Sequence, residues 1–393
     1  MSVVDLPSVV RPEEVGLSSQ RLATLSSAIK ERVDNGNIPG AVALIVRNDR
    51  VAYYESFGRL DPAARDPMGK DAIFRIYSMT KAIVSVATMM LYEEGKLFLS
   101  DPVAKFMPEY AGQKVLLADG SLVTPNSPMT VQDLLRHTSG ITYEFRGTRP
   151  IHTQYANARV FRRNQTNADQ AAGLAALPLD FHPGTQFEYS RSTDVLGRLI
   201  EVISGETLGV HLQRRILGPL GMVDTGFHVP EGKLARLAQS HAIDPVTGEA
   251  EMMLDVTRPA IFESGGGGLV STTMDYARFL QMLANNGQLN GTRLLGRKTI
   301  ELMTSDHLGD MPRPVDMIGP GFGFGLGFAV RTHAGMGTMP GSVGQYYWGG
   351  AAGTTFWIDP AERLFAVMMI QSRAQRDIYR VLFRDLVYSA IVD

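Results

Sequence analysis

Residues 74–91 read Phe-Arg-Ile-Tyr-Ser-Met-Thr-Lys-Ala-Ile-Val-Ser-Val-Ala-Thr-Met-Met-Leu and contain a Ser-x-x-Lys at Ser78 and Lys81. Apart from Ser85 and Thr88, the ten residues after Lys81 are apolar, and a helix that is apolar on every face is buried. We therefore expect a buried helix with Ser78 in its first turn, where free N–H groups and the helix dipole favour negative charge. Lys81, three residues later, lies on the same face within reach of the Ser78 hydroxyl.

This pairing predicts a serine acyl-transfer site. A hydroxyl is a weak nucleophile until a base removes its proton, and a lysine can be that base if burial lowers its pKa enough to leave it neutral. The pattern alone is weakly specific, because the chain holds a second Ser-x-x-Lys at Ser27 and Lys30. Apolar residues recur there at helical spacing among charged ones, which predicts an ordinary surface helix over 18–35.

Composition limits the class of protein. The 393 residues exceed what one compact core usually needs, so we expect two lobes. The net charge of −2 and the lack of a basic run argue against nucleic acid and anionic membranes as partners. With no cysteine, disulfides, thiolate metal sites and cysteine catalysis are excluded. We see neither a signal peptide nor an apolar run long enough to cross a membrane, and expect a cytoplasmic protein.

Strand patterns lie toward both ends of the chain. They are 40–47, 51–58, 325–330, 345–351, 353–359 and 364–370. Between them, residues 97–315 have mainly helical patterns and long loops, and a last helix is expected over 377–392. This order predicts an α+β fold, in which an antiparallel sheet built from both termini is flanked by helices and carries an inserted, mainly helical lobe.

The same order predicts two domains. Residues 1–76 and 318–393 together would form the domain that contains the sheet, and residues 77–317 would form the mainly helical domain. The active site is expected in the cleft between them.

Two further motifs have both a chemical and a structural interpretation. Tyr189 follows a turn that ends at Thr185, so it belongs on a loop; it is either packing or, near a lysine, a phenol that shuttles a proton. Trp348-Gly349-Gly350 is either a strand with an aromatic anchor or a place where glycines let a substrate approach an edge strand. In the second case the next backbone N–H would point at an oxyanion.

Other patterns argue against competing chemistries. Gly265–Gly268 lacks the residues of a phosphate-binding loop, so a tight turn or close backbone packing is expected there. The eight histidines lack zinc-site spacing, and no Gly-x-Ser-x-Gly marks a nucleophile elbow. We expect no metal and no organic cofactor.

Taken together, the motifs resemble the serine β-lactamase and penicillin-binding-protein superfamily, and most closely its family VIII carboxylesterases. The resemblance covers about residues 15–390. It rests on the order and spacing of the following segments: Ser78 to Lys81, residues 134–140, Tyr189-Ser190, residues 265–272 and Trp348-Gly349-Gly350.

The resemblance implies roles for individual residues. Ser78 would be the nucleophile, Lys81 its activating partner and Tyr189 the second acid/base residue, and the sequence does not decide whether Lys81 or Tyr189 is the general base. The N–H groups of Ser78 and Ala351 would form the oxyanion hole. The residues expected to bind substrate are Trp348, Gly349, Gly350 and Tyr143.

Two departures from the superfamily's pattern bear on the substrate. Trp348 stands where β-lactamases and peptidases usually have the lysine of Lys-Thr-Gly, and Arg191 replaces the asparagine of Tyr-x-Asn. Both weaken recognition of penicillins and peptides and favour a neutral ester. We therefore expect a serine esterase for small-molecule esters of short to medium chain length, with weak or no β-lactamase activity.

Other functions fit the same sequence. An acyltransferase, or a hydrolase of amides, D-peptides or β-lactams, would use the same residues. A non-catalytic ligand-binding module is the remaining alternative. The oligomeric state is left open.

Overall fold

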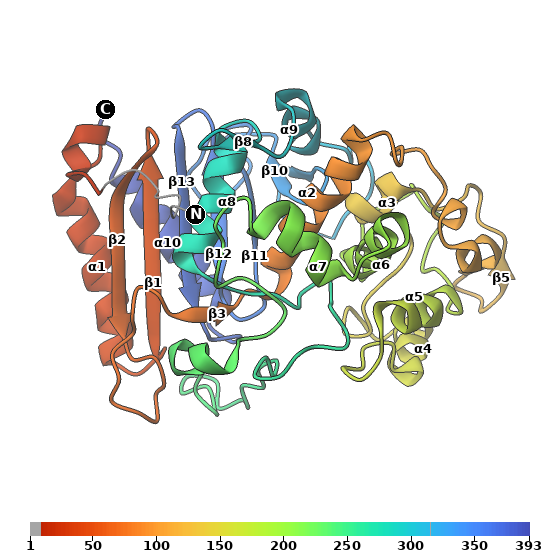
Figure 1. Cartoon of the computed structure of the whole chain (residues 1–393), viewed down its shortest axis with the longest axis horizontal. Coiled ribbons are helices and arrows are strands. Elements are labelled where there is room, and N and C mark those ends of the chain that lie inside the picture. Colours follow the sequence, from red (N-terminus) through yellow and green to blue (C-terminus); the bar gives the residue numbers. More distant parts are fainter. Residues whose placement is uncertain (1–8, 315) are drawn as a thin grey trace.

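The computed structural model describes residues 9–314 and 316–393. Figure 1 shows a half built around a large sheet and, beside it, a half made mostly of helices. In the described part of the chain the large sheet has seven antiparallel strands in the order β2-β1-β13-β12-β11-β10-β9. Its strands are β1 (Gly40–Arg47), β2 (Arg50–Gly58), β9 (Phe322–Phe324), β10 (Ala329–Arg331), β11 (Tyr346–Gly349), β12 (Thr355–Asp359) and β13 (Leu364–Ile370). The predicted α+β fold, with a sheet from both ends of the chain, is confirmed.

Strand β1 is buried along its whole length because both faces of the sheet are covered. Its residues 41, 43 and 45 pack in a core with helices α1 (Ser19–Asp34) and α10 (Arg376–Ser389). Residues 42, 44 and 46 belong to the main core on the other face, where α8 (Thr273–Ala284) contacts β1 and β13. Period-two alternation therefore sends apolar side chains to two cores, which explains the uninterrupted apolar run.

One strand prediction is wrong. Residues 325–330 do not form one continuous strand: β9 ends at Phe324, residues 325–328 turn the chain, and β10 begins at Ala329. The Gly325 N–H donates to the Phe328 carbonyl at 2.8 Å, and Gly327 has φ +101°. Glycine adopts this left-handed backbone without steric cost, so the turn falls where the apolar pattern suggested a continuous strand.

The helical half holds most of the remaining elements. One of these elements is helix α2 (Thr80–Glu93). It contacts α6 and is buried from Thr80 through Leu91. The other helices between the two ends of the sheet are α3 (Val131–Leu135), α4 (Pro150–Ala158), α5 (Asn167–Ala175), α6 (Ser192–Ser204), α7 (Leu208–Leu212) and α9 (Arg297–Met303). Thr130 caps α3 in a capping box with Asp133.

Short strand pairs complete the fold: β3 (Ile73–Arg75) with β6 (Val270–Thr272), β4 (Val115–Leu116) with β5 (Leu122–Val123), and β7 (Gln288–Leu289) with β8 (Thr292–Arg293). Among the described residues, no helix is both long and apolar enough to cross a membrane. The division into the domain of 1–76 and 318–393 and the domain of 77–317 stays a prediction.

Candidate active site

Ser78 lies at a sharp change of backbone direction. Strand β3 pairs with β6, and the pairing continues as the Ile76 N–H donates to the Leu269 carbonyl at 3.1 Å. The next residue, Tyr77, has φ +43°, a left-handed conformation that is costly for a residue with a side chain. Its hydroxyl accepts a hydrogen bond from the Leu254 N–H at 2.8 Å, which helps to hold the turn.

This turn corrects the predicted position of Ser78. Ser78 lies in a 3-10 turn, Tyr77–Met79, and α2 begins only at Thr80, so Ser78 is not in the first turn of the α-helix. The left-handed Tyr77 interrupts the backbone geometry that α-helical hydrogen bonding needs. Ser78 is half-buried and therefore accessible to a small molecule at the end of the buried helix.

Lys81 is 1% exposed, and the hydrogen bonds of its amine lie within the described part of the protein. Lys81 Nζ donates to the Gly266 carbonyl at 2.5 Å, to the Tyr143 hydroxyl at 3.1 Å and to Ser78 Oγ at 3.3 Å. It also lies 4.6 Å from the centre of the Tyr189 ring. The structure therefore brings together the predicted Ser78, Lys81 and Tyr189, and adds Tyr143 as a direct partner of the lysine.

The groups around Lys81 oppose the effect of burial on its pKa. Burial lowers the pKa of Lys81, but the nearby Tyr143 and Tyr189 and the Asp194 carboxylate together raise that pKa above its ordinary value. Burial raises the pKa of Tyr143 to about 12, although the Lys81 charge acts in the opposite direction. Burial alone therefore does not make Lys81 the base, and activation of Ser78 depends on how protons are shared within this group.

Tyr189 is held by Trp348 and His137. The indole Nε1 of Trp348 on β11 donates to the Tyr189 hydroxyl at 3.2 Å, which leaves the phenol's own proton free for transfer. The His137 ring centre lies 4.9 Å from that of Tyr189, and His137 Nδ1 accepts from the Ser190 N–H at 3.2 Å. Burial, with the Lys81 charge, holds the pKa of His137 well below its ordinary value, so this imidazole is neutral.

The turn after β11 lies against the segment that leads to Ser78. Strand β11 contacts the 3-10 turn of Ser78, and Thr354 Oγ1 donates to the Ile76 carbonyl at 3.3 Å. Ala351 is half-buried in this turn, and its N–H has no hydrogen-bond acceptor among the described residues. That Ala351 and Ser78 form an oxyanion hole, and that Trp348, Gly349, Gly350 and Tyr143 bind substrate, remain predictions.

Gly350→Ala is expected to lower kcat more than about tenfold and to lower the Tm, since overpacking destabilises and displaces backbone. The new Cβ would overlap Thr354 Oγ1 and the Ile76 carbonyl oxygen, which is backbone next to the Ser78 turn. Steady-state kinetics and thermal unfolding measure both effects. Gly112→Ala is the control, because a Cβ there meets nothing within 4 Å. Equal activity in the two variants would contradict the close approach at Gly350.

Two charged residues of the site were not assigned a role from the sequence. Asp194 is buried and accepts from Ser264 Oγ at 2.6 Å and from the Gly266 N–H at 2.9 Å, so it fixes the turn whose Gly266 carbonyl contacts Lys81. The close packing expected at Gly265–Gly268 is confirmed, since a Cβ on Gly265 would lie 2.5 Å from the Thr193 carbonyl oxygen. The signal for Asp194 is a carboxylate in the first turn of α6. Arg191 is described below.

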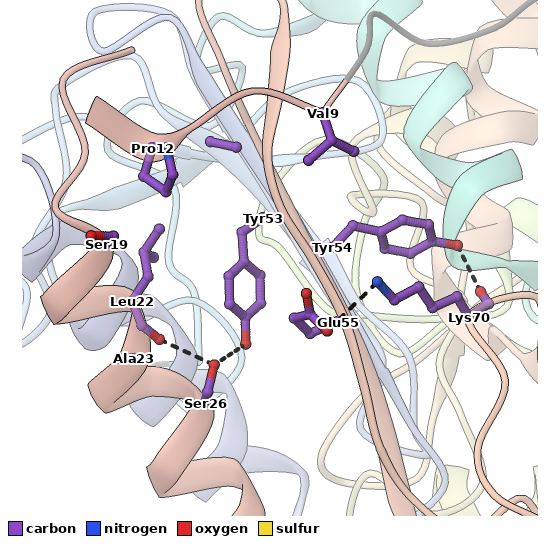
Figure 2. Close-up of a pocket in the computed structure, with 11 residues that line it drawn as sticks. Val9, Pro12, Ser19, Leu22, Ala23, Ser26, Tyr53, Tyr54, Glu55 and Lys70 are labelled. Carbon is purple, nitrogen blue, oxygen red and sulfur yellow. Dashed lines mark hydrogen bonds and ion pairs between the residues drawn. The ribbon is translucent and has the colours of Figure 1, made fainter. Parts of the chain in front are cut away.

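A separate cavity of about 350 Å³ lies between α1 and β2 (Figure 2). There Ser26 Oγ and the Tyr53 hydroxyl lie 2.9 Å apart, and burial raises the pKa of Tyr53 to about 12. Strand β2 is four strands away from β11 in the sheet. Among the described residues, Ser26 Oγ contacts the Leu22 carbonyl and the Tyr53 hydroxyl, whereas Ser78 Oγ contacts a lysine. Within residues 9–314 and 316–393, no cluster of His, Asp or Glu is arranged to hold a metal ion.

The chain is similar to one known family and to several known proteins. The sequence model of the family described as Beta-lactamase matches residues 25–388. Protein Rv1367c of Mycobacterium tuberculosis (strain ATCC 25618 / H37Rv) is 34% identical, over 88% of each chain, and Esterase EstB of Burkholderia gladioli is 28% identical, over 98% of each. The solved structure of EstCE1, described as a hydrolase with promiscuous acyltransferase activity, has a TM-score of 0.80 and 28% identity, and the match covers 94% of this chain and 99% of that one.

Proposed function

Since the chain belongs to the Beta-lactamase family, we propose that it is a serine esterase that hydrolyses carboxylic esters of short to medium chain length. The resemblance predicted from the motifs, to the esterase-like members of this group, is confirmed at the level of the family. The observation that carries the proposal is the contact of Ser78 Oγ with a fully buried lysine, 3.3 Å from Nζ, beside two phenols.

In the proposed reaction the group formed by Lys81 and Tyr189 has first released one proton to solvent, so that it can act as a base. Ser78 Oγ then attacks the ester carbonyl carbon and gives its proton to this group. The carbonyl oxygen becomes an oxyanion, to which the N–H groups of Ser78 and Ala351 would donate. Collapse of this intermediate breaks the bond to the alcohol oxygen, which takes up the proton, and leaves the acyl group on Ser78. Water then attacks the acyl-enzyme by the reverse proton transfers and releases the acid.

The preference for a neutral ester is supported by what replaces the two polar family positions. Trp348 presents an indole whose N–H already donates to Tyr189. Arg191 is buried and its guanidinium is paired with both carboxylate oxygens of Glu144. A substrate carboxylate therefore gains no unpaired positive charge from either of these two residues.

An acyltransferase is the second candidate, because the related EstCE1 is described with promiscuous acyltransferase activity. It would use the same acyl-enzyme and pass the acyl group to an alcohol instead of water. Product analysis with p-nitrophenyl butyrate and added alcohol separates the two, since a transferase yields mainly the new ester.

The esterase proposal is tested by hydrolysis of p-nitrophenyl butyrate, p-nitrophenyl palmitate and a chromogenic cephalosporin under the same conditions. We expect the butyrate to have the highest kcat/KM and the cephalosporin to be turned over slowly or not at all. Preference for the palmitate, or efficient turnover of the cephalosporin, would contradict the proposed substrate class. An inactive wild type would shift the assignment to amides, acyl transfer or ligand binding.

A further inference from the structure

Arg191 is a buried cation whose contacts are all within the protein. Its side chain is 3% exposed, and its Cζ lies 4.9 Å from the centre of the Tyr143 ring and 4.6 Å from that of Phe161. Nε donates to one oxygen of Glu144 at 3.1 Å and Nη2 to the other at 2.6 Å. This forked pairing and the stacking on aromatic rings fix the plane of the guanidinium, which a lysine at this position could not reproduce.

Two short chains of contacts connect Arg191 to Lys81. On one side Arg191 packs on Tyr143, whose hydroxyl accepts from Lys81 Nζ at 3.1 Å. On the other, Arg191 Nη1 lies 3.7 Å from Asp194 Oδ2, and Asp194 holds the N–H of Gly266. The Gly266 carbonyl accepts from Lys81 Nζ at 2.5 Å. Arg191 therefore contacts Tyr143, which accepts a hydrogen bond from Lys81, and Asp194, which holds the turn of the other acceptor, Gly266.

The charges around Lys81 give this geometry an electrostatic consequence. Lys81 faces the Tyr143 and Tyr189 phenols and the neutral His137, and the Asp194 carboxylate raises the pKa of Lys81. The positive charge of Arg191 lowers the pKa of Tyr143, opposite to the effect of Asp194. Without Arg191 the Asp194 charge would be less well balanced, and a buried negative charge increases the affinity of neighbouring groups for protons.

We propose that Arg191 is a positioning residue for the nucleophile's activating group: it holds Tyr143 and Asp194 around Lys81 and offsets the buried carboxylate. One proton on the group around Lys81 blocks activation of Ser78. With Arg191 present, this group loses that proton at a lower pH. The direction of this pH shift is the same whether Lys81 or Tyr189 is the general base, because a nearby positive charge favours deprotonation of either residue. The inference rests on the proposed function only in requiring an activated Ser78.

The test measures the rate at which a fluorophosphonate probe labels Ser78 as a function of pH, in wild type, Arg191→Gln, Arg191→Lys and Glu144→Gln. In Arg191→Gln the acid limb of the profile of labelling rate against pH is expected to move to higher pH by about one unit, since a positive charge is lost. In Glu144→Gln, which removes a negative charge, the limb moves to lower pH. Arg191→Lys restores the limb toward wild type, but its highest rate stays reduced because the fork and the stacking are lost.

Arg214→Gln is the matched control, because Arg214 makes the same forked pairing with Glu206 on the surface, at 3.0 and 2.7 Å. Its limb is expected to match wild type, since exposed pairs are screened by solvent. Shifts of the same sign in Arg191→Gln and Glu144→Gln, or no shift in either, would overturn the proposal.

The remaining outcomes also decide the question. If Arg191→Gln does not fold, as judged by circular dichroism, an unshifted limb in Glu144→Gln overturns the proposal and a downward shift supports it. Labelling of Ser78 with the expected shifts but no ester hydrolysis overturns the proposed function and supports the role of Arg191. A wild type that the probe does not label overturns both.

Discussion

Ser78→Ala is expected to lower the kcat for p-nitrophenyl butyrate by at least about 10³-fold, because removing a nucleophile removes the acyl-enzyme route. The variant should keep its fold and its Tm within a few degrees. Ser78 is half-buried at the end of α2, and among the described residues its hydroxyl has one hydrogen-bond partner, Lys81 Nζ. Steady-state kinetics and mass spectrometry of the trapped acyl-enzyme measure the loss.

Ser27→Ala is the matched control for this experiment. Ser27 and Lys30 repeat the Ser-x-x-Lys spacing on α1, but Ser27 is exposed and Lys30 is paired with Asp34 at 2.5 Å. Wild-type kinetics are expected in this variant. Activity that survives in Ser78→Ala, or that is lost in Ser27→Ala, would show that the Ser78 site is not the catalytic one.

Tyr189→Phe is expected to lower kcat by about 10²–10⁴-fold, the range typical of a lost acid/base residue. The KM should change little, because the phenyl ring keeps its packing against Trp348, whose ring centre is 5.1 Å away. The variant leaves the Trp348 Nε1 without its Tyr189 acceptor, so a modest loss of stability accompanies the loss of rate. Single-turnover kinetics of acylation and deacylation show whether both steps slow, as a proton shuttle requires.

Tyr143→Phe distinguishes a shuttle from a scaffold. Tyr143 also borders Lys81, with its hydroxyl 3.1 Å from Nζ, and the sequence assigned it to substrate binding. If Tyr189 transfers the proton, Tyr143→Phe should cost kcat less than Tyr189→Phe does. A larger loss in Tyr143→Phe would transfer the acid/base role to Tyr143.

The fold was predictable where one physical rule dominated. Apolar runs between turn residues identified the strands that both cores bury, and the helical spacing of apolar residues over 18–35 located α1. The exceptions have local causes. The left-handed Tyr77 delays α2 by one 3-10 turn, and Gly327 turns a run that is apolar enough for a strand.

The site was predictable as a set of residues more than as a charge distribution. The motifs located Ser78, Lys81, Tyr189 and Trp348, which lie in contact in the structure. They did not reveal that the pKa of Lys81 is raised, because that depends on phenols and a carboxylate brought from distant parts of the chain. Asp194 could be noticed as a carboxylate in the first turn of α6, but its link to Lys81 passes through the Gly266 backbone, which no sequence pattern encodes.

The position of β13 has a consequence for how the chain folds during synthesis. β13 pairs with β1 on one side and β12 on the other, so β1 meets this partner only after residues 48–363 have been translated. Until then one edge of the apolar β1 is unpaired, and such edges invite aggregation. Refolding should accordingly be slow, since the contacts that close the sheet join residues far apart in sequence. Slower translation of the codons before β13 would lengthen the time for which the edge of β1 is exposed. A chaperone that covers the β1–β2 hairpin would raise the yield of folded protein.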